Sequence, residues 1–573
     1  MTTDSAPERG ARGLFSGRPS GIHSWDRSPS ARSRSLRVSL RDPGVPVALA
    51  RRPFSAAAKA TVVAVTAAGL LAPGAIVDRY GDAAAAAAPT AAVPPPIADW
   101  QHERLASGVD LYQGSVSGRP GADHWTVTVR ANGAHLAAER DAEALAERVR
   151  AAGFGARAEA VAWPRGSDRT GVIGVRVRVG EYDARTDADA QRKELAAAGF
   201  DAVSEWTGAD GVPGTGIARV KVAIVDPKRY GGAMKGTYGT GVAGRETVSD
   251  MAADDEALLG VNAGFFVMEG KDGVPGAAAG IAAYDGELQS AATNGRIAAV
   301  LRGDGLRPEF KKLRTELRVR AGSASAVVDG INRVPGLVRN CGGVGGDSPT
   351  ERPQHDVTCT DPDEIVKFTD ELGANTPAGE GLEAVLDANG RVREVRARGG
   401  VVPDGGSVLA GIGAGATWLR THAKPGSAVK AGQRILDERG RELKLGPQDD
   451  IVNGGPELVR DGKVAVNYAA DGIERAGDRS FAYTWGIKRN PRMLLGVDRQ
   501  GRMLLAGVDG RQPGHSDGFG LGEGAELMKS LGAVHAMALD GGGSVTMTVN
   551  GKVINSPSDG TERPVGDALL LTR

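Results

Sequence analysis

A four-residue repeat most constrains how this chain can fold. Ala-Ala-Gly-Phe closes one helix-like segment at residues 151–154 and returns at 197–200, after a second helix-like segment. In each segment small and apolar residues recur at helical spacing up to a glycine stop, which predicts helices over 141–152 and 187–198. Stretches that predict strands lie at 125–129, 156–163, 172–179 and 202–206. The order strand, helix, strand, strand, helix, strand predicts a split βαβ sandwich, with both helices on one face of a four-stranded antiparallel sheet.

This segment, residues 123–207, resembles the SPOR (sporulation-related) domain. The resemblance rests on the doubled helix-Gly-Phe pattern and on strand 172–178, which is followed by Gly180-Glu181-Tyr182. It implies that the module binds peptidoglycan glycan strands through the exposed face of its sheet. Trp125, Arg176 and Arg178 would then contact sugar, or they would form an ordinary solvated surface. A ferredoxin-like spacer without a ligand is the alternative for the whole module.

The first 82 residues have the composition of a basic extension followed by a secretory signal. Residues 1–58 carry ten arginines and no lysine against four acidic residues, too polar a mixture to order itself. The apolar run at 60–72 follows Arg51-Arg52-Pro53-Phe54 and is shorter than the ~20 residues that cross a bilayer. Small residues come next, as in an export signal. A single membrane anchor and a true start downstream of Met1 are the alternatives.

Residues 83–122 follow as an Ala/Pro-rich stretch, which predicts a semi-rigid linker. Lysine plus arginine equal aspartate plus glutamate at 70 each, so overall charge gives no reason to expect a nucleic acid partner. The export signal leads us to expect a secreted or cell-wall-associated protein that contacts the membrane only through that signal.

Glycine and cysteine usage narrow the fold class. The 84 glycines predict many turns and close backbone approaches, which favours a loop-rich fold with strands over a helical bundle. Only two cysteines are present, which excludes a disulfide-dense scaffold and a cysteine-rich zinc site. After export into an oxidising compartment we expect Cys341 and Cys359 to pair, with two free thiols as the alternative.

Residues 217–573 contain several strand ends that open into Asn, Asp or Gly turns. The most specific is Leu539-Asp540-Gly541-Gly542-Gly543-Ser544 after the apolar stretch 534–539. A carboxylate ends the strand, and three glycines let the backbone approach a ligand closely. Such a turn suits an anion such as phosphate, sugar hydroxyls or a metal ion on Asp540. The other motifs are Asn262-Ala263-Gly264-Phe265-Phe266, Asn453-Gly454-Gly455-Pro456, Asp509-Gly510-Arg511 and 555–565.

Together these motifs resemble the phosphodiester glycosidase (NAGPA) family over residues 217–573. The resemblance implies hydrolysis of a sugar-1-phosphate diester at the anomeric carbon–oxygen bond. One departure is Asp567, where the family ending suggests asparagine. The expected fold is α+β, a mixed-sheet glycosidase-like domain preceded by the split βαβ module.

Residue chemistry suggests roles for these positions. A phosphodiester leaving group is already a stable anion, so its cleavage needs positive or N–H stabilisation more than proton donation. Guanidinium groups match phosphate oxygens, and we expect Arg511, Arg563 and Arg492 to bind them. Asp540 and Asp509 are the first candidates for nucleophile or base, and Glu526 and Glu562 the second. The further expected substrate-binding residues are Asn262, Gly264, Asn453, Gly454, Gly455, Gly541, Gly542, Gly543 and Ser544.

No cofactor is certain from the sequence. Asp509, Asp540 and Asp559 are possible oxygen ligands for Ca²⁺ or Mg²⁺. The eight histidines show no zinc-type spacing, and His515 is interpreted as a loop histidine. Two functions stay open. One is an exported hydrolase of sugar-1-phosphodiesters (GlcNAc-1-phosphodiester-like) in envelope glycopolymers, anchored to peptidoglycan by the SPOR-like module. The other is a non-catalytic envelope glycan-binding protein.

Overall fold

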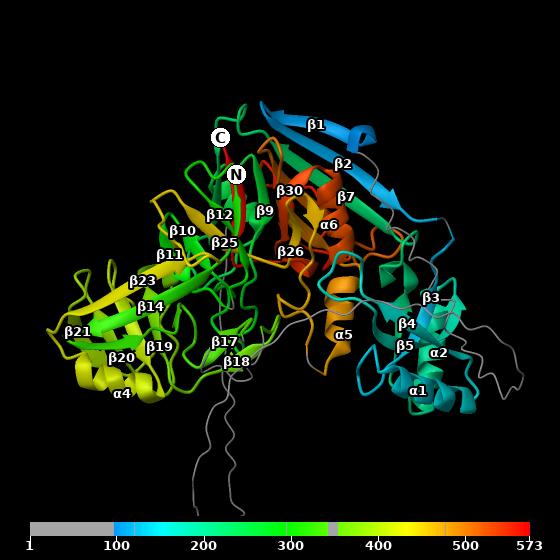
Figure 1. Ribbon diagram of the computed structural model, residues 1–573, viewed down its shortest axis with the longest axis horizontal. Coiled ribbons are helices and arrows are strands. Elements are labelled where there is room, and N and C mark those ends of the chain that lie inside the picture. Colours follow the sequence, from blue (N-terminus) through cyan, green and yellow to red (C-terminus); the bar gives the residue numbers. More distant parts are fainter. Residues whose placement is uncertain (1–96, 120, 294, 342–352, 476) are drawn as a thin grey trace, which may run out of the picture. The chain divides into compact units, whose positions relative to one another are not determined.

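The structure is a computed structural model that describes residues 97–573 except 120, 294, 342–352 and 476 (Figure 1). These residues belong to one compact unit that begins at Arg79. The basic extension and secretory signal expected over residues 1–82 lie outside the described residues. Within the described ranges no helix is both long and apolar enough to cross a bilayer. The fold is α+β, as predicted, and its sheets are mostly antiparallel.

The largest sheet has eight strands and runs through the glycosidase-like part. Its central strands are apolar on both faces because both faces are covered. Their spatial order is β1 (Gln101–Ala106), β2 (Val109–Ser117), β7 (Ile217–Val225), β29 (Met503–Val508), β28 (Arg492–Asp498), β30 (Ala533–Ala538), β26 (Glu457–Arg460) and β27 (Lys463–Val464).

The expected linker over 83–122 is wrong for residues 101–117. These residues form β1 and β2, and β2 pairs antiparallel with β7 along its whole length. Val109 and Leu111 of β2 lie in the main core, at 0% and 1% exposure. The sheet of the glycosidase-like part therefore begins before the module and resumes after it at residue 217. The alternating stretch was missed because it follows directly on the Ala/Pro-rich run.

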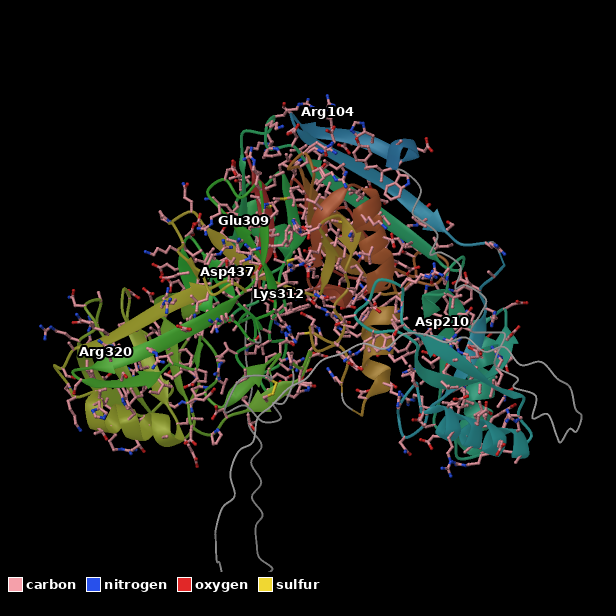
Figure 2. The ribbon with its side chains drawn as sticks, in the orientation of Figure 1. Arg104, Asp210, Glu309, Lys312, Arg320 and Asp437 are labelled. Carbon is pink, nitrogen blue, oxygen red and sulfur yellow. A yellow bond between two sulfur atoms is a disulfide. The ribbon has the colours of Figure 1, made fainter. Side chains whose placement is uncertain are left out.

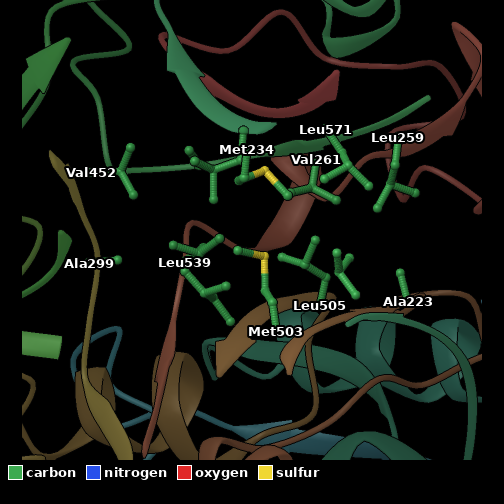
Figure 3. Close-up of a cluster of buried hydrophobic side chains, with 14 of the residues drawn as sticks. Ala223, Met234, Leu259, Val261, Ala299, Val452, Met503, Leu505, Leu539 and Leu571 are labelled. Carbon is green, nitrogen blue, oxygen red and sulfur yellow. The ribbon is translucent and has the colours of Figure 1, made fainter. Parts of the chain in front are cut away.

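A five-stranded sheet packs face to face against the large sheet. Figure 3 shows Met234, Val261 and Leu571 on one side of the shared core, opposite Met503 and Leu505 on the other. The strands of this second sheet are β32 (Lys552–Val553), β31 (Met547–Val549), β9 (Leu259–Asn262), β33 (Ala568–Thr572) and β8 (Ala233–Thr237). Helix α3 (Val248–Asp254) packs on β9, and α6 (Leu521–Ser530) packs on β30 and β26.

Three smaller sheets extend from this sandwich and share a separate core cluster. The first is β11 (Glu287–Ser290), β10 (Ala282–Tyr284), β25 (Asp450–Asn453), β12 (Ile297–Leu301) and β13 (Glu309–Lys312). The second is β15 (Ala324–Val327), β14 (Arg314–Ala321), β23 (Val429–Leu436) and β24 (Glu442–Leu443). The third is β16 (Gly330–Ile331), β19 (Ile365–Thr369), β22 (Ser407–Gly411), β20 (Leu382–Leu386) and β21 (Val392–Arg396), with α4 (Gly413–His422) packed on it.

The predicted disulfide is present. Cys341 and Cys359 are bonded, with their Cα atoms 5.7 Å apart, and both are fully buried. The bond adjoins a small hairpin of β17 (Leu337–Arg339) and β18 (Thr358–Thr360).

The split βαβ module has the predicted order of elements. It comprises β3 (Trp125–Val129), α1 (Glu139–Ala151), β4 (Ala156–Ala162), β5 (Val172–Tyr182), α2 (Arg185–Ala197) and β6 (Ala202–Trp206). The strands pair antiparallel in the order β4-β5-β3-β6. Apolar residues of both helices and of one sheet face form the module's core, so α1 and α2 cover the same face. The four-residue repeat was therefore a correct guide to this part of the fold.

Candidate functional site

The turn that follows β30 is built around Asp540. The backbone N–H of Asp540 donates to the carbonyl of Ala263 at 2.8 Å, which ties the strand end to the Asn262–Phe266 motif. The turn continues into a short 3-10 turn over Gly542–Ser544. Asn262 holds the turn through two hydrogen bonds. Its Nδ2 donates to the Asp540 carbonyl at 2.8 Å, and its Oδ1 accepts from the Thr546 N–H at 3.1 Å. Two motifs far apart in the sequence thus meet at Asp540.

Three arginines approach the three glycines of this turn, one at each position. A Cβ atom on Gly541 would lie 3.9 Å from Nη1 of Arg492, and one on Gly542 would lie 3.2 Å from Nη2 of Arg511. A Cβ on Gly543 would clash with Nη2 of Arg563. Gly542 and Gly543 therefore leave room for guanidinium groups, whereas a Cβ on Gly541 would crowd the carbonyl of Pro491, at 2.9 Å. The structure thus brings three of the predicted arginines to the turn that follows Asp540.

Arg492, on β28, is the most buried of the three arginines. Its Nε donates to the carbonyl of Phe519 at 3.0 Å and its Nη2 to the carbonyl of Trp485 at 2.5 Å, and the guanidinium lies 5.3 Å from the Trp485 ring centre. None of these partners is a carboxylate. Burial lowers the pKa of Arg492 to about 10, and the nearby Arg511 charge acts in the same direction. Arg492 thus presents a cation without a direct anionic partner.

Arg511 and Arg563 complete the positive side of the site. Arg511 has a positive φ of 59° after Gly510, and its Nε donates to Oδ1 of Asn490 at 3.0 Å. Although Arg511 is exposed, loss of hydration among the neighbouring atoms and the charge of Arg563 lower the pKa of its guanidinium group. Arg563 donates through Nε and Nη2 to Oδ2 of Asp559, at 2.9 and 2.5 Å. Three guanidinium groups thus face two carboxylates, Asp540 and Asp559, which leaves a positive excess suited to an anion.

Asp540 is half-buried, and burial raises the pKa of its carboxyl to about 6. Ser544, the Gly541 N–H and the charge of Arg563 oppose this rise. The Gly541 N–H donates to Oδ1 of Asp540 at 2.9 Å. A carboxylate that titrates near 6 is mostly ionised at neutral pH but accepts a proton readily, which suits a nucleophile or base.

The expected sugar-binding asparagines have bracing roles in the structure. Asn262 is 0% exposed and makes the two bonds described above. Asn453 is 3% exposed; Oδ1 accepts from the Phe265 N–H at 2.8 Å and Nδ2 donates to the Phe265 carbonyl. Gly264 allows the approach of Asn453, because a Cβ there would lie 2.5 Å from Nδ2 of Asn453, and Gly454 lies against β30, where a Cβ would be 2.5 Å from the carbonyl of Ala538. Gly455 precedes the cis peptide bond to Pro456 and faces Asp471.

The other three carboxylate candidates have different partners. Asp509 is 2% exposed and pairs with Lys221 Nζ at 3.2 Å, and it accepts from the Ser556 N–H. Glu526 pairs with Lys529 on the surface of α6. Glu562 accepts from the Ser249 N–H at 3.0 Å and from its hydroxyl, so it caps the start of α3. Of the four predicted catalytic carboxylates, only Asp540 adjoins the three-glycine turn.

The possible metal ligands do not gather in one place. Asp509 pairs with Lys221 and Asp559 with Arg563. Over the described ranges, no three His, Cys, Asp or Glu side chains are grouped as a metal site would need. Nε2 of His515 lies 3.8 Å from Oδ2 of Asp509, so this histidine is a neighbour of Asp509.

Two residues that hold the site were not predicted from the sequence. Trp485 supplies the carbonyl and the ring that contact Arg492, and Asn490 holds Arg511. Because every residue has a backbone carbonyl, the residue type does not show which carbonyl binds Arg492. The role of Trp485 could therefore not be predicted from a single sequence.

The arginines expected on the open face of the module are not exposed. Arg176 and Arg178 are 8% and 1% exposed, so they form neither a solvated edge nor an open sugar platform. Asp210, labelled in Figure 2, pairs with both. Trp125 is half-buried, 5.5 Å from the Trp206 ring.

Comparisons with known proteins agree with this architecture. The family model of phosphodiester glycosidases matches residues 381–572, and that of the SPOR domain matches residues 122–204. The crystal structure of a putative exported protein from Burkholderia pseudomallei K96243 has a TM-score of 0.74 and 33% identity to this chain. That match covers 82% of this chain and 96% of the other.

Two curated proteins match shorter stretches. The N-acetylglucosamine-1-phosphodiester alpha-N-acetylglucosaminidase of Mus musculus is 32% identical over 117 residues, 20% of this chain and 22% of that enzyme. An uncharacterized prophage-derived protein of Bacillus subtilis is 39% identical over 84 residues, 15% of this chain and 13% of that protein. The chain thus spans about a fifth or less of the length of these curated relatives. Taken together with the Asp540 turn and the split βαβ module, the matches show that this chain carries a phosphodiester glycosidase region over residues 381–572 and a SPOR domain over residues 122–204.

Proposed function

We propose that this chain hydrolyses sugar-1-phosphodiesters at the anomeric carbon–oxygen bond, which frees the sugar and leaves a phosphomonoester. The observation that carries the proposal is the approach of Arg492, Arg511 and Arg563 to the three glycines that follow Asp540. A phosphodiester carries one negative charge, and the positive excess of the site complements it. The name of the mouse relative, a glucosaminidase that acts on a 1-phosphodiester, supports the same reaction class.

In the proposed mechanism the arginines bind the phosphate oxygens and Asp540 works at the anomeric carbon. Asp540 attacks that carbon as the bond to the phosphate oxygen breaks, giving a glycosyl ester that water then hydrolyses; alternatively, Asp540 takes a proton from the water that attacks the carbon directly. The departing phosphomonoester is a stable anion, so guanidinium groups fixed in place stabilise the charge it gains. Their hydrogen bonds to the carbonyls of Phe519 and Trp485 and to Asn490 hold two of them in position before substrate arrives.

The natural substrate that we propose is a GlcNAc-1-phosphodiester-like linkage in an envelope glycopolymer. The SPOR domain supports attachment to peptidoglycan, and the similarity to an exported protein supports a secreted or cell-wall-associated location. Retention of the whole chain on insoluble cell wall, against a chain with the same charge and no SPOR domain, tests the attachment. Loss of the chain in the wash contradicts it.

The test of the reaction is release of N-acetylglucosamine from N-acetylglucosamine-1-methylphosphate by the full chain. Asp540→Asn removes the proposed nucleophile or base, and we expect turnover to fall about 100-fold or more. Glu526→Gln is the matched control, because it also neutralises one carboxylate but its partner is Lys529 on α6. Sugar binding by the wild-type chain without any turnover would favour the non-catalytic glycan-binding function instead.

A further inference from the structure

The polar face of the module's sheet is buried inside the protein. Apolar side chains on the other face pack against α1 and α2. The polar face therefore should be open to solvent in a free-standing split βαβ sandwich, yet five of its side chains have 0–8% exposure. They are Thr126, Thr128, Arg176, Arg178 and Glu205.

The segment that covers this face runs from Arg479 to Asn490. It contains α5 (Arg479–Phe481) and η4 (Ala482–Ile487), a π-helical turn. Nη1 of Arg176 donates to the hydroxyl of Tyr483 at 2.7 Å, and Nζ of Lys488 donates to Oε1 of Glu205 at 2.6 Å. We call residues 479–490 the bridging segment.

Buried charges fix the contact at its centre. Arg178 makes a two-pronged ion pair with Asp210, at 2.5 and 2.8 Å, and the Tyr483 hydroxyl donates to Oδ1 of Asp210 at 3.2 Å. Breaking such a buried, mutually satisfied network leaves charges without partners, which is costly. Nearby, Ile173 of the module shares one core cluster with Tyr483 and Ile487. The module is therefore packed as part of this core.

The same bridging segment holds two of the three site arginines. The carbonyl of Trp485, two residues after Tyr483, accepts from Arg492. Asn490, two residues after Lys488, accepts from Nε of Arg511 through Oδ1. Nδ2 of Asn490 donates to the carbonyls of Thr484 and Lys488, both at 3.1 Å, which fixes the side chain to the segment.

From these two sets of contacts we infer that the sheet of the module positions Arg492 and Arg511 through the bridging segment. Tyr483 and Glu205 are then positioning residues of the hydrolase site. The module helps to hold that site in shape, besides any role in attaching the protein to peptidoglycan. This inference rests on the proposed function, because it assigns the two arginines to phosphate binding. It also implies that a ligand of the polar sheet face would have to displace the bridging segment.

The first test is a double-mutant cycle between Tyr483 and Arg492. Tyr483→Phe removes the hydroxyl that contacts Arg176 and Asp210 and keeps the ring. We expect kcat/KM for N-acetylglucosamine-1-methylphosphate to fall about 2- to 30-fold, the usual range for a residue coupled to a site at a distance. In the Arg492→Lys background the same substitution should lower kcat/KM by a much smaller factor. The reason is that Tyr483 acts on the site through the contact between Trp485 and Arg492. Equal losses in both backgrounds would mean that Tyr483 acts only on the fold, and would overturn the inference.

The matched control is Arg169→Met. Arg169 also joins the module to the glycosidase-like part, through an ion pair with Glu474 at 2.5 Å, but Glu474 lies outside the bridging segment. We expect its kcat/KM to stay within twofold of wild type in both backgrounds. A loss in this control equal to that of Tyr483→Phe would show that any weakening of the interface matters, which contradicts the specific route.

A binding measurement separates this inference from the proposed reaction. The same cycle is read on the dissociation constant of inorganic phosphate by calorimetry, which needs no turnover. If the wild-type chain binds phosphate and the cycle is non-additive, but no sugar phosphodiester is cleaved, the positioning inference stands and the hydrolase proposal fails. If the wild-type chain does not bind phosphate, both are overturned. Glu205→Gln paired with Arg511→Lys repeats the test on the second branch, with the same non-additivity expected.

Discussion

The hydroxyl of Tyr284 donates to the carboxyl of Asp567 at 2.9 Å, and the Gly264 N–H donates to the other carboxyl oxygen at 2.7 Å. Asp567 is 2% exposed, so its two oxygens are occupied inside the fold. The departure from the family's expected asparagine therefore affects the support of the Asn262–Phe266 motif. Both carboxyl oxygens already accept a hydrogen bond inside the fold.

Asp567→Asn should stabilise the protein at neutral pH. Burial raises the pKa of Asp567 to about 6, above its usual value near 3.8. A raised pKa means that the folded state prefers the protonated acid, so the contribution to stability is full below pH ~4 and declines until pH ~6. The amide avoids that cost, and we expect the free energy of unfolding at pH 7.5 to rise by about 1–3 kcal/mol.

Urea unfolding at pH 4.5 and 7.5 measures this effect. The gain of Asp567→Asn over wild type should be full at pH 7.5 and fall to about a third of that at pH 4.5. Asp404→Asn, on an exposed turn, is the control and should show no such pH-dependent gain. A gain of the same size at both pH values would place the cause in packing and not in the charge.

The pH profile of kcat/KM should show an acid limb governed by Asp540. Its pKa is raised to about 6, so the carboxylate needed as nucleophile or base is lost as pH falls through that value. For a single essential carboxylate we expect kcat/KM to fall about tenfold per pH unit below pH 6. Steady-state rates between pH 4.5 and 8 give the profile, and a flat line over that range would remove Asp540 from this role.

Ser544→Ala should move that acid limb to higher pH. The buried Ser544 hydroxyl has no hydrogen-bond partner among the described residues, and its proximity to Asp540 lowers the pKa of that carboxyl against the effect of burial. Without it the carboxyl holds its proton to a higher pH, so the midpoint of the limb rises. Ser558→Ala is the control, because Ser558 contacts Asp559 and not Asp540. If the midpoint of the acid limb is the same in Ser544→Ala as in wild type, the hydroxyl does not interact with the ionised carboxylate.

Reduction of the disulfide should lower stability without changing the fold class. The bond closes a loop with a sequence separation of 18, for which the chain-entropy estimate is about 3 kcal/mol. The enclosed stretch also carries His355, whose ring lies 4.2 Å from Trp485 and 4.7 Å from Phe265. Guanidinium unfolding with and without a thiol reductant measures the loss. The Cys341→Ser/Cys359→Ser variant is the control and should be insensitive to the reductant.

The sequence predicted the module well because its signals are local. The repeat at 151–154 and 197–200 ends helices, and alternation along 172–179 marks a strand, so the elements follow from neighbouring residues. Its burial was not predictable, since that depends on Tyr483 and Lys488, about 300 residues away. The strands at 101–117 were missed because they follow directly on the Ala/Pro-rich run, and the pairing of β2 with β7 depends on residues far along the chain.

At the site, residue types alone pointed to the arginines near the three-glycine turn, but they did not reveal which residues hold those arginines in place. Arg492, Arg511 and Arg563 meet at the turn that the glycine triplet marked. Asn262 and Asn453 look like ligand-binding amides in sequence, but buried amides also satisfy strand ends, and only coordinates separate the two uses. Asp509 was misleading in the same way, because its buried cation partner, Lys221, is on a strand nearly 300 residues earlier.

Gly543→Ala tests whether the glycine triplet serves the arginines. Gly543 has no positive φ, so alanine introduces no backbone strain there. Its methyl group would occupy the place of Nη2 of Arg563 and of Oδ2 of Asp559, the ends of side chains that can swing away. We therefore expect a small change in unfolding free energy and a loss in kcat/KM of about 100-fold, similar to the loss of a donor that stabilises developing charge. Gly270→Ala, at an exposed position with open space around it, is the control for adding a methyl group. If Gly543→Ala unfolds the protein instead, or leaves kcat/KM unchanged, the triplet is a backbone requirement and Arg563 does not need the position that the structure gives it.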